Sequence, residues 1–226
     1  MNNPISVLLL EDSIYDAEII LYELRKQGMK FVNIHAYSKE QFLEGLKKRP
    51  DIILADYSLP QFTANEALKL MKELGYDIPF IVISGMIGEE LAVEMMRLGA
   101  SDYLMKDRLG RLSTAVATAL ESAELRKMNE QYTRDLVESN ARYKSLFNDS
   151  PISLWEEDFS SLKVMLEELT ASGITDLRTH FLENSEALDH LCQSRNLITI
   201  NQATVDLYGA SSKEEAYNDL SNIEQY

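Results

Sequence analysis

Three acidic residues carry the clearest chemistry in this sequence. Asp56 follows the short apolar run Ile52–Ala55. The adjacent acids Glu11 and Asp12 follow a second apolar run, Ile5–Leu10. Carboxylates that are forced together repel one another unless a cation joins them. Mg²⁺ suits such a group, because it prefers oxygen ligands, keeps several waters and readily accepts a phosphate oxygen. The ion would also let Asp56 act as a nucleophile toward phosphorus and become an aspartyl phosphate.

A hydroxyl and an ammonium follow two further predicted strands. Ser84 follows the apolar run Phe80–Ile83, and Lys106 follows the short strand Ser101–Leu104. Such groups can stabilise the equatorial oxygens of a phosphoryl group in transfer. A single Ser or Lys after a strand is usually only solvated. The ordered set of five polar residues, each just past a predicted strand, therefore carries the prediction of a phosphoryl-transfer site.

Together with a weaker strand over Phe31–Ala36, these four strands alternate with segments of helical spacing, five times along the chain. Short continuous apolar runs are typical of strands buried on both faces of a parallel sheet. The spacing predicts helices over 14–27, around 42–46, over 64–74, over 89–98 and from about residue 109. This alternation predicts an α/β fold, with right-handed crossovers and helices on both faces of a five-stranded, doubly wound parallel sheet. A strand order of 2-1-3-4-5 would bring the acids into one crevice.

The composition excludes several classes of protein. The chain has 226 residues and a formal net charge of -15, and its Lys and Arg residues are not clustered as a nucleic-acid surface requires. The single cysteine, Cys192, excludes an internal disulfide and a Cys-rich zinc site, and we expect it to be a core residue. No signal peptide and no membrane-spanning apolar run is present, so we expect no membrane association and a cytoplasmic location.

A long helical pattern begins at Leu109 and continues to Leu146. Its apolar residues follow heptad spacing with two shifts, and no Gly or Pro lies between Gly110 and Pro151. This pattern predicts a helix of about 35 residues, with a coiled coil that unwinds locally at the shifts. Such a helix must bury its apolar stripe, so we predict a homodimer through residues 109–147. The alternative is that the helix folds back on another part of its own chain.

Four motifs resemble those of the response regulator receiver domain. They are Leu-Leu-Leu-Glu11-Asp12, Ala-Asp56-Tyr-Ser-Leu-Pro60, Val-Ile-Ser84-Gly and Gly99-Ala-Ser-Asp-Tyr103-Leu-Met-Lys106. The resemblance covers roughly residues 4–122 and implies a flavodoxin-like fold of five parallel strands and five helices. One position departs from the family pattern, because Asp107 follows the lysine where proline is usual. We expect a looser loop there.

The resemblance also implies the partners of this domain and the roles of its site residues. It implies that Asp56 accepts a phosphoryl group from a histidine kinase, a phosphotransfer protein or a small phosphodonor. It implies that Glu11, Asp12 and Asp56 hold Mg²⁺. In the same resemblance Ser84 is the switch hydroxyl, Tyr103 the switch aromatic and Lys106 the phosphate-binding lysine.

Residues 143–159 and 197–215 resemble pieces of a PAS sensor domain. About 35 residues of helical patterning replace the tight hairpin of that family, and the sequence ends at Tyr226, before its three remaining strands. We therefore assign no ligand or cofactor to this half. The resulting division is a receiver domain over residues 1–122, a signalling helix over 123–147 and a partial PAS-like segment with a helical insertion over 148–226.

Two other functions fit parts of the pattern. A phosphatase of the haloacid-dehalogenase type needs a second aspartate two residues after the first, and Ser58 stands there. A receiver-like scaffold that works without phosphorylation would lack an acid, the hydroxyl or the lysine, and none is missing. We therefore expect a non-enzymatic two-component signalling protein with an output region.

Overall fold

The computed structural model describes residues 4–85, 88–194 and 196–221. The chain divides into two compact units, Met1–Tyr132 and Thr133–Tyr226. None of the described helices is both long enough and apolar enough to cross a membrane. The side chain of Cys192 lies outside the described part of the structure, so its expected place in a core stays a prediction.

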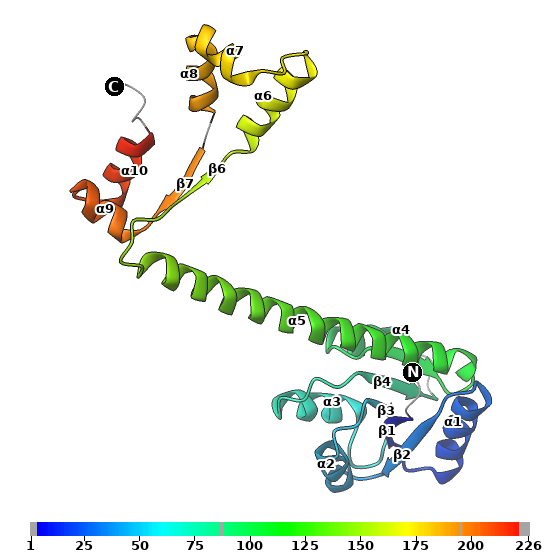
Figure 1. The fold of residues 1–226 in the computed structure, drawn as a ribbon. Coiled ribbons are helices and arrows are strands. Elements are labelled where there is room, and N and C mark those ends of the chain that lie inside the picture. Colours follow the sequence, from blue (N-terminus) through cyan, green and yellow to red (C-terminus); the bar gives the residue numbers. More distant parts are fainter. Residues whose placement is uncertain (1–3, 86–87, 195, 222–226) are drawn as a thin grey trace. The chain divides into compact units, whose positions relative to one another are not determined.

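Strands and helices alternate along the first unit (Figure 1). In chain order the elements are β1 (Ile5–Leu10), α1 (Ile14–Lys26), β2 (Phe31–Ala36), α2 (Lys39–Lys47), β3 (Ile52–Asp56), α3 (Ala64–Glu73), β4 (Phe80–Ser84), α4 (Glu89–Arg97), β5 (Asp102–Met105), the short 3₁₀ helix η1 (Leu109–Arg111) and α5 (Leu112–Asn148). The five strands are parallel in the order β2-β1-β3-β4-β5. This confirms the predicted doubly wound sheet.

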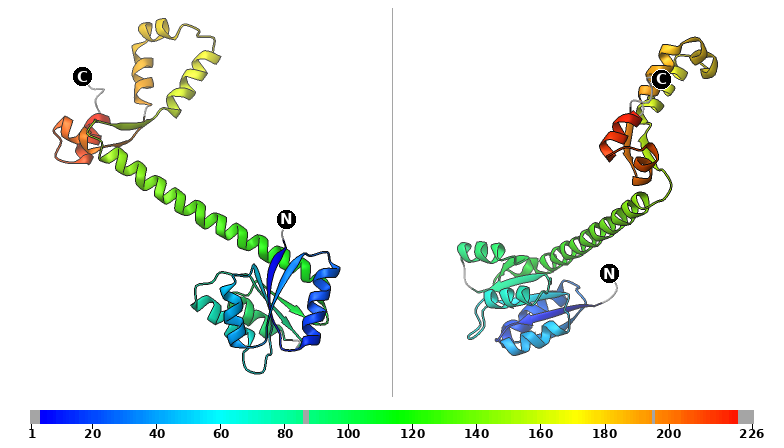
Figure 2. Two further views of the ribbon diagram at one scale, coloured as in Figure 1. Left: turned by 60° about the horizontal axis from the view of Figure 1, so that its bottom comes forward. Right: turned by 90° about the vertical axis from the view of Figure 1, so that its left-hand side faces the viewer.

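Helices cover both faces of the sheet (Figure 2). The sheet separates two apolar cores, one on each face. Val7 and Leu9 of β1 pack with α1 and the start of α5. Leu8 and Leu10 alternate with them and pack with α2 and α3 on the other face. Because β3 and β4 are buried along their whole lengths, their sequences are continuously apolar until the last residue. Helix α2 approaches closely at Gly45, where an added Cβ would lie 2.5 Å from a methyl carbon of Leu8.

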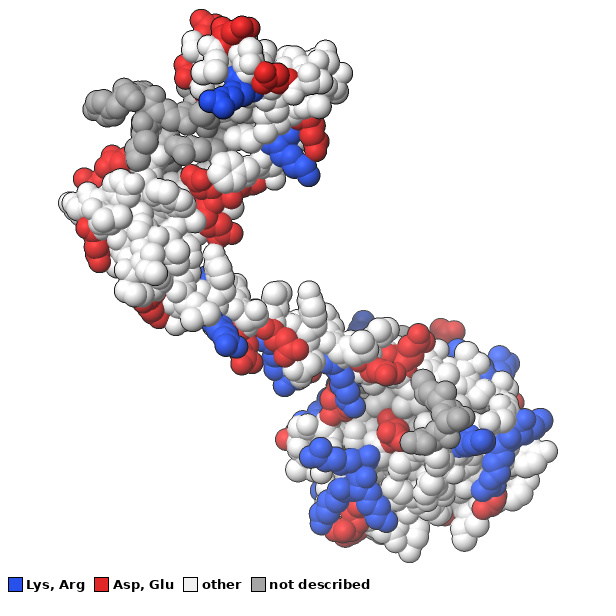
Figure 3. Space-filling view, in the orientation of Figure 1, with Lys and Arg blue, Asp and Glu red and all other residues white. Residues whose placement is uncertain are grey.

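Charged side chains of both signs are interspersed on the visible face of the first unit (Figure 3). Several form exposed ion pairs, including Arg25 with Glu18 and Lys26 with Glu23. Exposed pairs of this kind contribute only about 0–1 kcal/mol each. The stability of this unit therefore rests on the two apolar cores.

Helix α5 has 37 residues, in agreement with the predicted long helix. Leu112, Val116 and Ala119 are buried against the sheet. Farther along, the apolar side chains are exposed, with 60% of Leu125 and 62% of Met128 accessible. The structure describes a single chain, so the coiled coil and the dimer stay predictions.

The second unit is a small α+β region. After the end of α5 its elements are β6 (Trp155–Asp158), α6 (Ser160–Ala171), α7 (Leu177–Glu183), α8 (Ser185–Gln193), β7 (Asn196–Ile200), α9 (Gln202–Tyr208) and α10 (Lys213–Ser221). Strands β6 and β7 pair antiparallel. The helical patterning predicted between these strands is confirmed as α6, α7 and α8. A small apolar core gathers Leu197, Ile200, Val205, Ala216 and Leu220.

One buried amide joins the chain before β6 to the start of α9. The side-chain oxygen of Asn201 accepts hydrogen bonds from the backbone N–H groups of Leu154 and Thr204, both at 3.0 Å, and from the Thr204 hydroxyl at 2.8 Å. Its side-chain nitrogen donates to the carbonyl oxygen of Ile152 at 2.8 Å. Asn201 is the N-cap of α9 and is fully buried, so no water can replace these bonds.

We expect Asn201→Ala to destabilise the second unit by about 3 kcal/mol, because the change removes a helix cap and leaves several buried groups without partners. Amide hydrogen exchange of the whole chain would measure this as faster exchange at Leu154 and Thr204, with no change in β1–β5. Asn184→Ala, at an exposed amide whose described side-chain hydrogen bond is to the carbonyl oxygen of His180 in α7, is the matched control. Equal exchange in the two variants would contradict the prediction.

Candidate functional site

The carboxyl ends of β1 and β3 bring three acids together. Leu10 of β1 is in register with Ala55 of β3, so the residues that follow them lie side by side. Glu11 is fully buried, Asp56 is 6% exposed and Asp12 is exposed. One carboxylate oxygen from each lies within 4.8 Å of the others. These are the three acids that the sequence analysis expected to converge.

Ser84 and Lys106 come from the next two strands along the sheet. Ser84 is the last residue of β4 and is buried. Lys106 follows β5, and its backbone N–H donates to the carbonyl oxygen of Ser84 at 2.8 Å. The ammonium nitrogen of Lys106 lies 2.8 Å from Glu11 Oε2 and 3.4 Å from Asp56 Oδ1. The lysine therefore serves as the cation of the acidic group in this structure.

A third carboxylate, which the sequence analysis missed, binds the same lysine most closely. Asp16 Oδ2 accepts a hydrogen bond from the Lys106 ammonium at 2.6 Å. Asp16 lies in the first turn of α1, where its backbone N–H donates to the N-cap hydroxyl of Ser13 at 3.2 Å. The Ser13 N–H in turn donates to Glu11 Oε1 at 3.1 Å. One sequence feature could have indicated Asp16: the helix α1 begins directly after Glu11 and Asp12, with Ser13 as its N-cap, so its first turn lies next to these two acids.

The electrostatics of the pocket follow from burial and from this crowding. Burial raises the pKa of Glu11, and the charge of Asp56 adds to the effect, while the ammonium of Lys106 opposes it. Burial also raises the pKa of Asp56, with a smaller contribution from Asp12 and opposition from Lys106. Burial lowers the pKa of Lys106, but its interactions with Asp16 and Glu11 outweigh burial, so the net pKa shift of the lysine is upward. The ammonium is thus fixed in its charged form.

Tyr103 lies on β5 and is half-buried. Its side chain packs against the core on the α2 and α3 side of the sheet. Arg111 of η1 donates from one guanidinium nitrogen to both carboxylate oxygens of Asp102, at 2.8 and 3.0 Å, and to the carbonyl oxygen of Tyr103 at 3.3 Å. These bonds tie β5 to η1 across the loop that contains Asp107, where the sequence predicts a looser connection.

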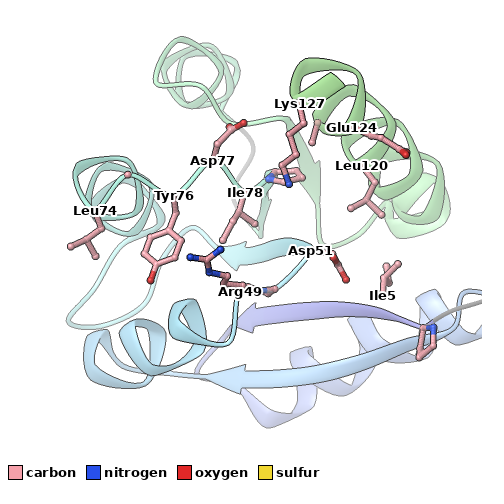
Figure 4. Close-up of a pocket in the computed structure, with 15 residues that line it drawn as sticks. Ile5, Arg49, Asp51, Leu74, Tyr76, Asp77, Ile78, Leu120, Glu124 and Lys127 are labelled. Atoms are coloured by element: carbon pink, nitrogen blue, oxygen red, sulfur yellow. The ribbon is translucent and has the colours of Figure 1, made fainter. Parts of the chain in front are cut away.

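A separate crevice lies at the amino ends of the strands (Figure 4). It measures about 1040 Å³, and its lining includes Ile5, Arg49, Asp51, Tyr76 and Lys127. Ile5 begins β1 and Asp51 precedes β3, so the crevice opens at the end of the sheet opposite to the acidic pocket. It contains none of the five predicted site residues, and its size alone gives it no chemistry. The acidic pocket is therefore the candidate site.

The acidic pocket fits a divalent cation. Glu11, Asp12 and Asp56 supply hard oxygen ligands within reach of one ion. The upward pKa shifts of Glu11 and Asp56 show that the buried negative charges are incompletely compensated by Lys106. An ion would complete that compensation, and the exposed Asp12 leaves the site open to water and to a phosphate oxygen.

Comparisons with known proteins agree with this geometry. The family model of the response regulator receiver domain matches residues 7–117. Regulatory protein LuxO of Vibrio cholerae is 31% identical over 105 residues, which cover 46% of this chain and 22% of that protein. The phosphate regulon transcriptional regulatory protein PhoB of Klebsiella pneumoniae is 24% identical over 165 residues, which cover 69% of each protein. The chain thus spans only about a fifth of the length of the LuxO protein.

A solved structure shows the same likeness in three dimensions. The signal receiver domain assigned to a LuxO repressor protein from Vibrio parahaemolyticus is 25% identical, with a TM-score of 0.51, and the match covers 57% of this chain and 98% of that one. The sequence match and the fold agree over the same part of the chain, and we conclude that residues 7–117 form a response regulator receiver domain, the receiving module of two-component signalling.

Proposed function

We propose that Asp56 accepts a phosphoryl group from a partner histidine kinase, from a phosphotransfer protein or from a small phosphodonor. The single observation that carries this proposal is the place of the Asp56 carboxylate. It ends the central strand β3, shares a cluster with Glu11 and Asp12, and lies 3.4 Å from the ammonium of Lys106. A receiver domain implies a histidine kinase as its partner, and this pocket is where the transferred group would arrive.

In the proposed reaction an Asp56 oxygen forms a bond to phosphorus while the bond from phosphorus to the donor breaks. The electron pair of the broken bond stays with the donor, which leaves as acetate when the donor is acetyl phosphate. Mg²⁺, held by Glu11, Asp12 and Asp56, would supply positive charge to the phosphoryl oxygens. Lys106 adds its ammonium, and the Ser84 hydroxyl can donate to a phosphoryl oxygen.

Ser84 and Tyr103 are the proposed switch residues. A phosphoryl group adds charge and three acceptor oxygens to the pocket. Ser84 would move toward these oxygens, and Tyr103 would move into the space that Ser84 leaves, as one discrete repacking. The half-buried position of Tyr103 against one of the two cores supports this route.

The output part of the proposal rests on α5. We propose a receiver domain over residues 1–122, a signalling helix over 123–147 and a PAS-like segment over 148–226, with two chains paired through residues 109–147. The exposed apolar side chains of Leu125, Met128 and Leu136 support pairing, because a helix with such a stripe is stabilised by burying it. Phosphorylation would then alter the packing of the paired helices.

A scaffold that binds partners without phosphorylation is the alternative function. No observation favours it, since all five residues needed for phosphoryl transfer are present at the strand ends.

The first test is direct phosphorylation. Incubation with Mg²⁺ and acetyl phosphate should add one phosphoryl group to the chain, measured by intact mass. Asp56→Asn should abolish uptake, because an amide oxygen is a poor nucleophile toward phosphorus. Asp77→Asn makes the same chemical change at an exposed acid at the other end of the strands and should not alter uptake. If Asp56→Asn is labelled as fast as the parent, Asp56 is not the acceptor and the scaffold alternative gains support.

The second test concerns stability without metal. Because the pKa values of Glu11 and Asp56 are raised on folding, the folded chain holds protons that the unfolded chain releases, and stability falls as pH rises from about 4 through their folded pKa values. Asp56→Asn removes one of these charges. At neutral pH without Mg²⁺ we expect this variant to unfold at a higher temperature, by roughly 4 °C for a gain on the order of 1 kcal/mol.

The same thermal melts give the metal response. Mg²⁺ should raise the unfolding temperature of the parent and of Asp77→Asn, because it binds the folded state, and should have little effect on Asp56→Asn. A lower unfolding temperature for metal-free Asp56→Asn than for the parent would contradict the electrostatic argument.

The third test concerns pairing through α5. Leu125→Glu combined with Met128→Glu places charges on the apolar stripe, so we expect light scattering at micromolar concentration to shift from the mass of a dimer to that of a monomer. Gln131→Glu combined with Ala141→Glu adds the same charges at exposed positions of the same helix away from the stripe and should leave the dimer intact. A parent chain that is monomeric under these conditions would end the pairing proposal and leave the receiver assignment untouched.

A further inference from the structure

Lys106 faces more negative charge than one ammonium can neutralise. Three carboxylates surround its nitrogen, with Asp16 nearest at 2.6 Å, Glu11 at 2.8 Å and Asp56 farthest at 3.4 Å. The shortest of these contacts is a hydrogen bond to Asp16, the one of the three partners that lies outside the acidic cluster of Glu11, Asp12 and Asp56. Glu11 Oε2, although 2.8 Å from the ammonium, has no hydrogen-bond partner among the described residues.

We propose that Asp16 is a positioning residue that holds Lys106 in the unphosphorylated pocket and competes with the phosphoryl group for its ammonium. This inference rests on the proposed phosphorylation of Asp56. It assigns to the first turn of α1 a part in setting how readily the phosphorylated state forms.

The position of Asp16 is fixed by the start of the helix. Ser13 caps α1 and accepts the backbone N–H of Asp16, while the Ser13 N–H donates to Glu11. These two hydrogen bonds connect the first turn of α1 to Glu11, the residue that follows β1. The side chains of Asp16 and Lys106 are 32% and 21% exposed, so their ion pair is partly shielded from water. A partly buried, hydrogen-bonded charge pair is worth more than an exposed one.

Phosphorylation of Asp56 would give the Lys106 ammonium new hydrogen-bond acceptors. A phosphoryl group on Asp56 brings negative charge and three acceptor oxygens into the pocket. To bond with these oxygens the ammonium must move toward Asp56, its most distant partner, and lengthen its bond to Asp16. The charge of Asp16 opposes that movement. Glu11 and Asp56 are also proposed metal ligands, so Asp16 is the one of the three partners that is not a proposed metal ligand.

A purely structural role for Asp16 makes a different prediction. An acid in the first turn stabilises a helix through the helix dipole, whatever Lys106 does. Loss of that effect would lower stability, and it would not depend on the presence of the lysine. A double-mutant cycle between Asp16 and Lys106 separates the two roles.

The experiment measures the affinity of the full chain for beryllofluoride, an analogue of the phosphoryl group, in saturating Mg²⁺. Asp16→Asn keeps the size and a hydrogen-bond acceptor but removes the charge, and we expect it to bind beryllofluoride roughly fivefold more tightly than the parent, a coupling typical of charged groups in contact. Asp16→Glu, which restores the charge, should return the affinity toward that of the parent. In a Lys106→Met background, Asp16→Asn should change the affinity by less than twofold.

Glu18→Gln is the matched control, because it removes the charge of an exposed acid on the same helix. The described ion pair of Glu18 is to Arg25 and not to Lys106. It should leave the affinity unchanged. If Asp16→Asn binds beryllofluoride no more tightly than the parent, this inference is wrong and the proposed function stands. The same holds if Asp16→Asn raises the affinity by the same factor in the Lys106→Met background as in the parent. A parent chain that fails to bind beryllofluoride overturns the proposed function and this inference together.

Discussion

The concentration of carboxylates around one ammonium is the constraint on which the receiver unit depends. Parallel strands end at the same edge of a sheet, so every polar residue placed just after a strand arrives in the same small space. Glu11, Asp56 and Lys106 meet there because β1, β3 and β5 run in the same direction. The raised carboxyl pKa values record the energetic cost of burying these charges. Two apolar cores must offset that cost, and the central strands β3 and β4 are buried and apolar up to their last residues.

The sequence predicted this unit well because doubly buried strands have an unmistakable pattern. Continuous apolar runs mark β3 and β4, and a polar residue ends each of them, so Asp56 and Ser84 could be identified from the sequence alone. Asp16 could not, because it belongs to the regular pattern of a helix. Its contact with Lys106 joins residues 90 positions apart, and helical spacing carries no information about such a partner.

The second unit was less predictable for a physical reason. Amphipathic spacing correctly predicted the helices between β6 and β7, because spacing depends only on local geometry. In the structure Leu162, Met165 and Leu169 of α6 are only half-buried, and α6 has no fully buried residue. Burial depends on which surfaces meet, and the sequence pattern does not encode that. The family match ends at residue 117, so the PAS-like interpretation of this region stays a prediction.

The start of α5 is where a change in the pocket can become a movement of the long helix. The backbone N–H of Lys106 donates a hydrogen bond to Ser84 of β4. Arg111 of η1 donates hydrogen bonds to the Asp102 carboxylate and to the Tyr103 carbonyl oxygen, both in β5. From α1, the Gln27 side chain accepts the backbone N–H of Ser113 at 3.1 Å and donates to the carbonyl of Leu109 at 3.4 Å. The first turn of α5 is therefore tied to both elements that supply Lys106 and Asp16 to the pocket. Under the proposed mechanism, a shift of the lysine toward Asp56 would alter the loop between β5 and η1. The continuous α5 would carry this change along the helix past Ala123, the last of its buried residues.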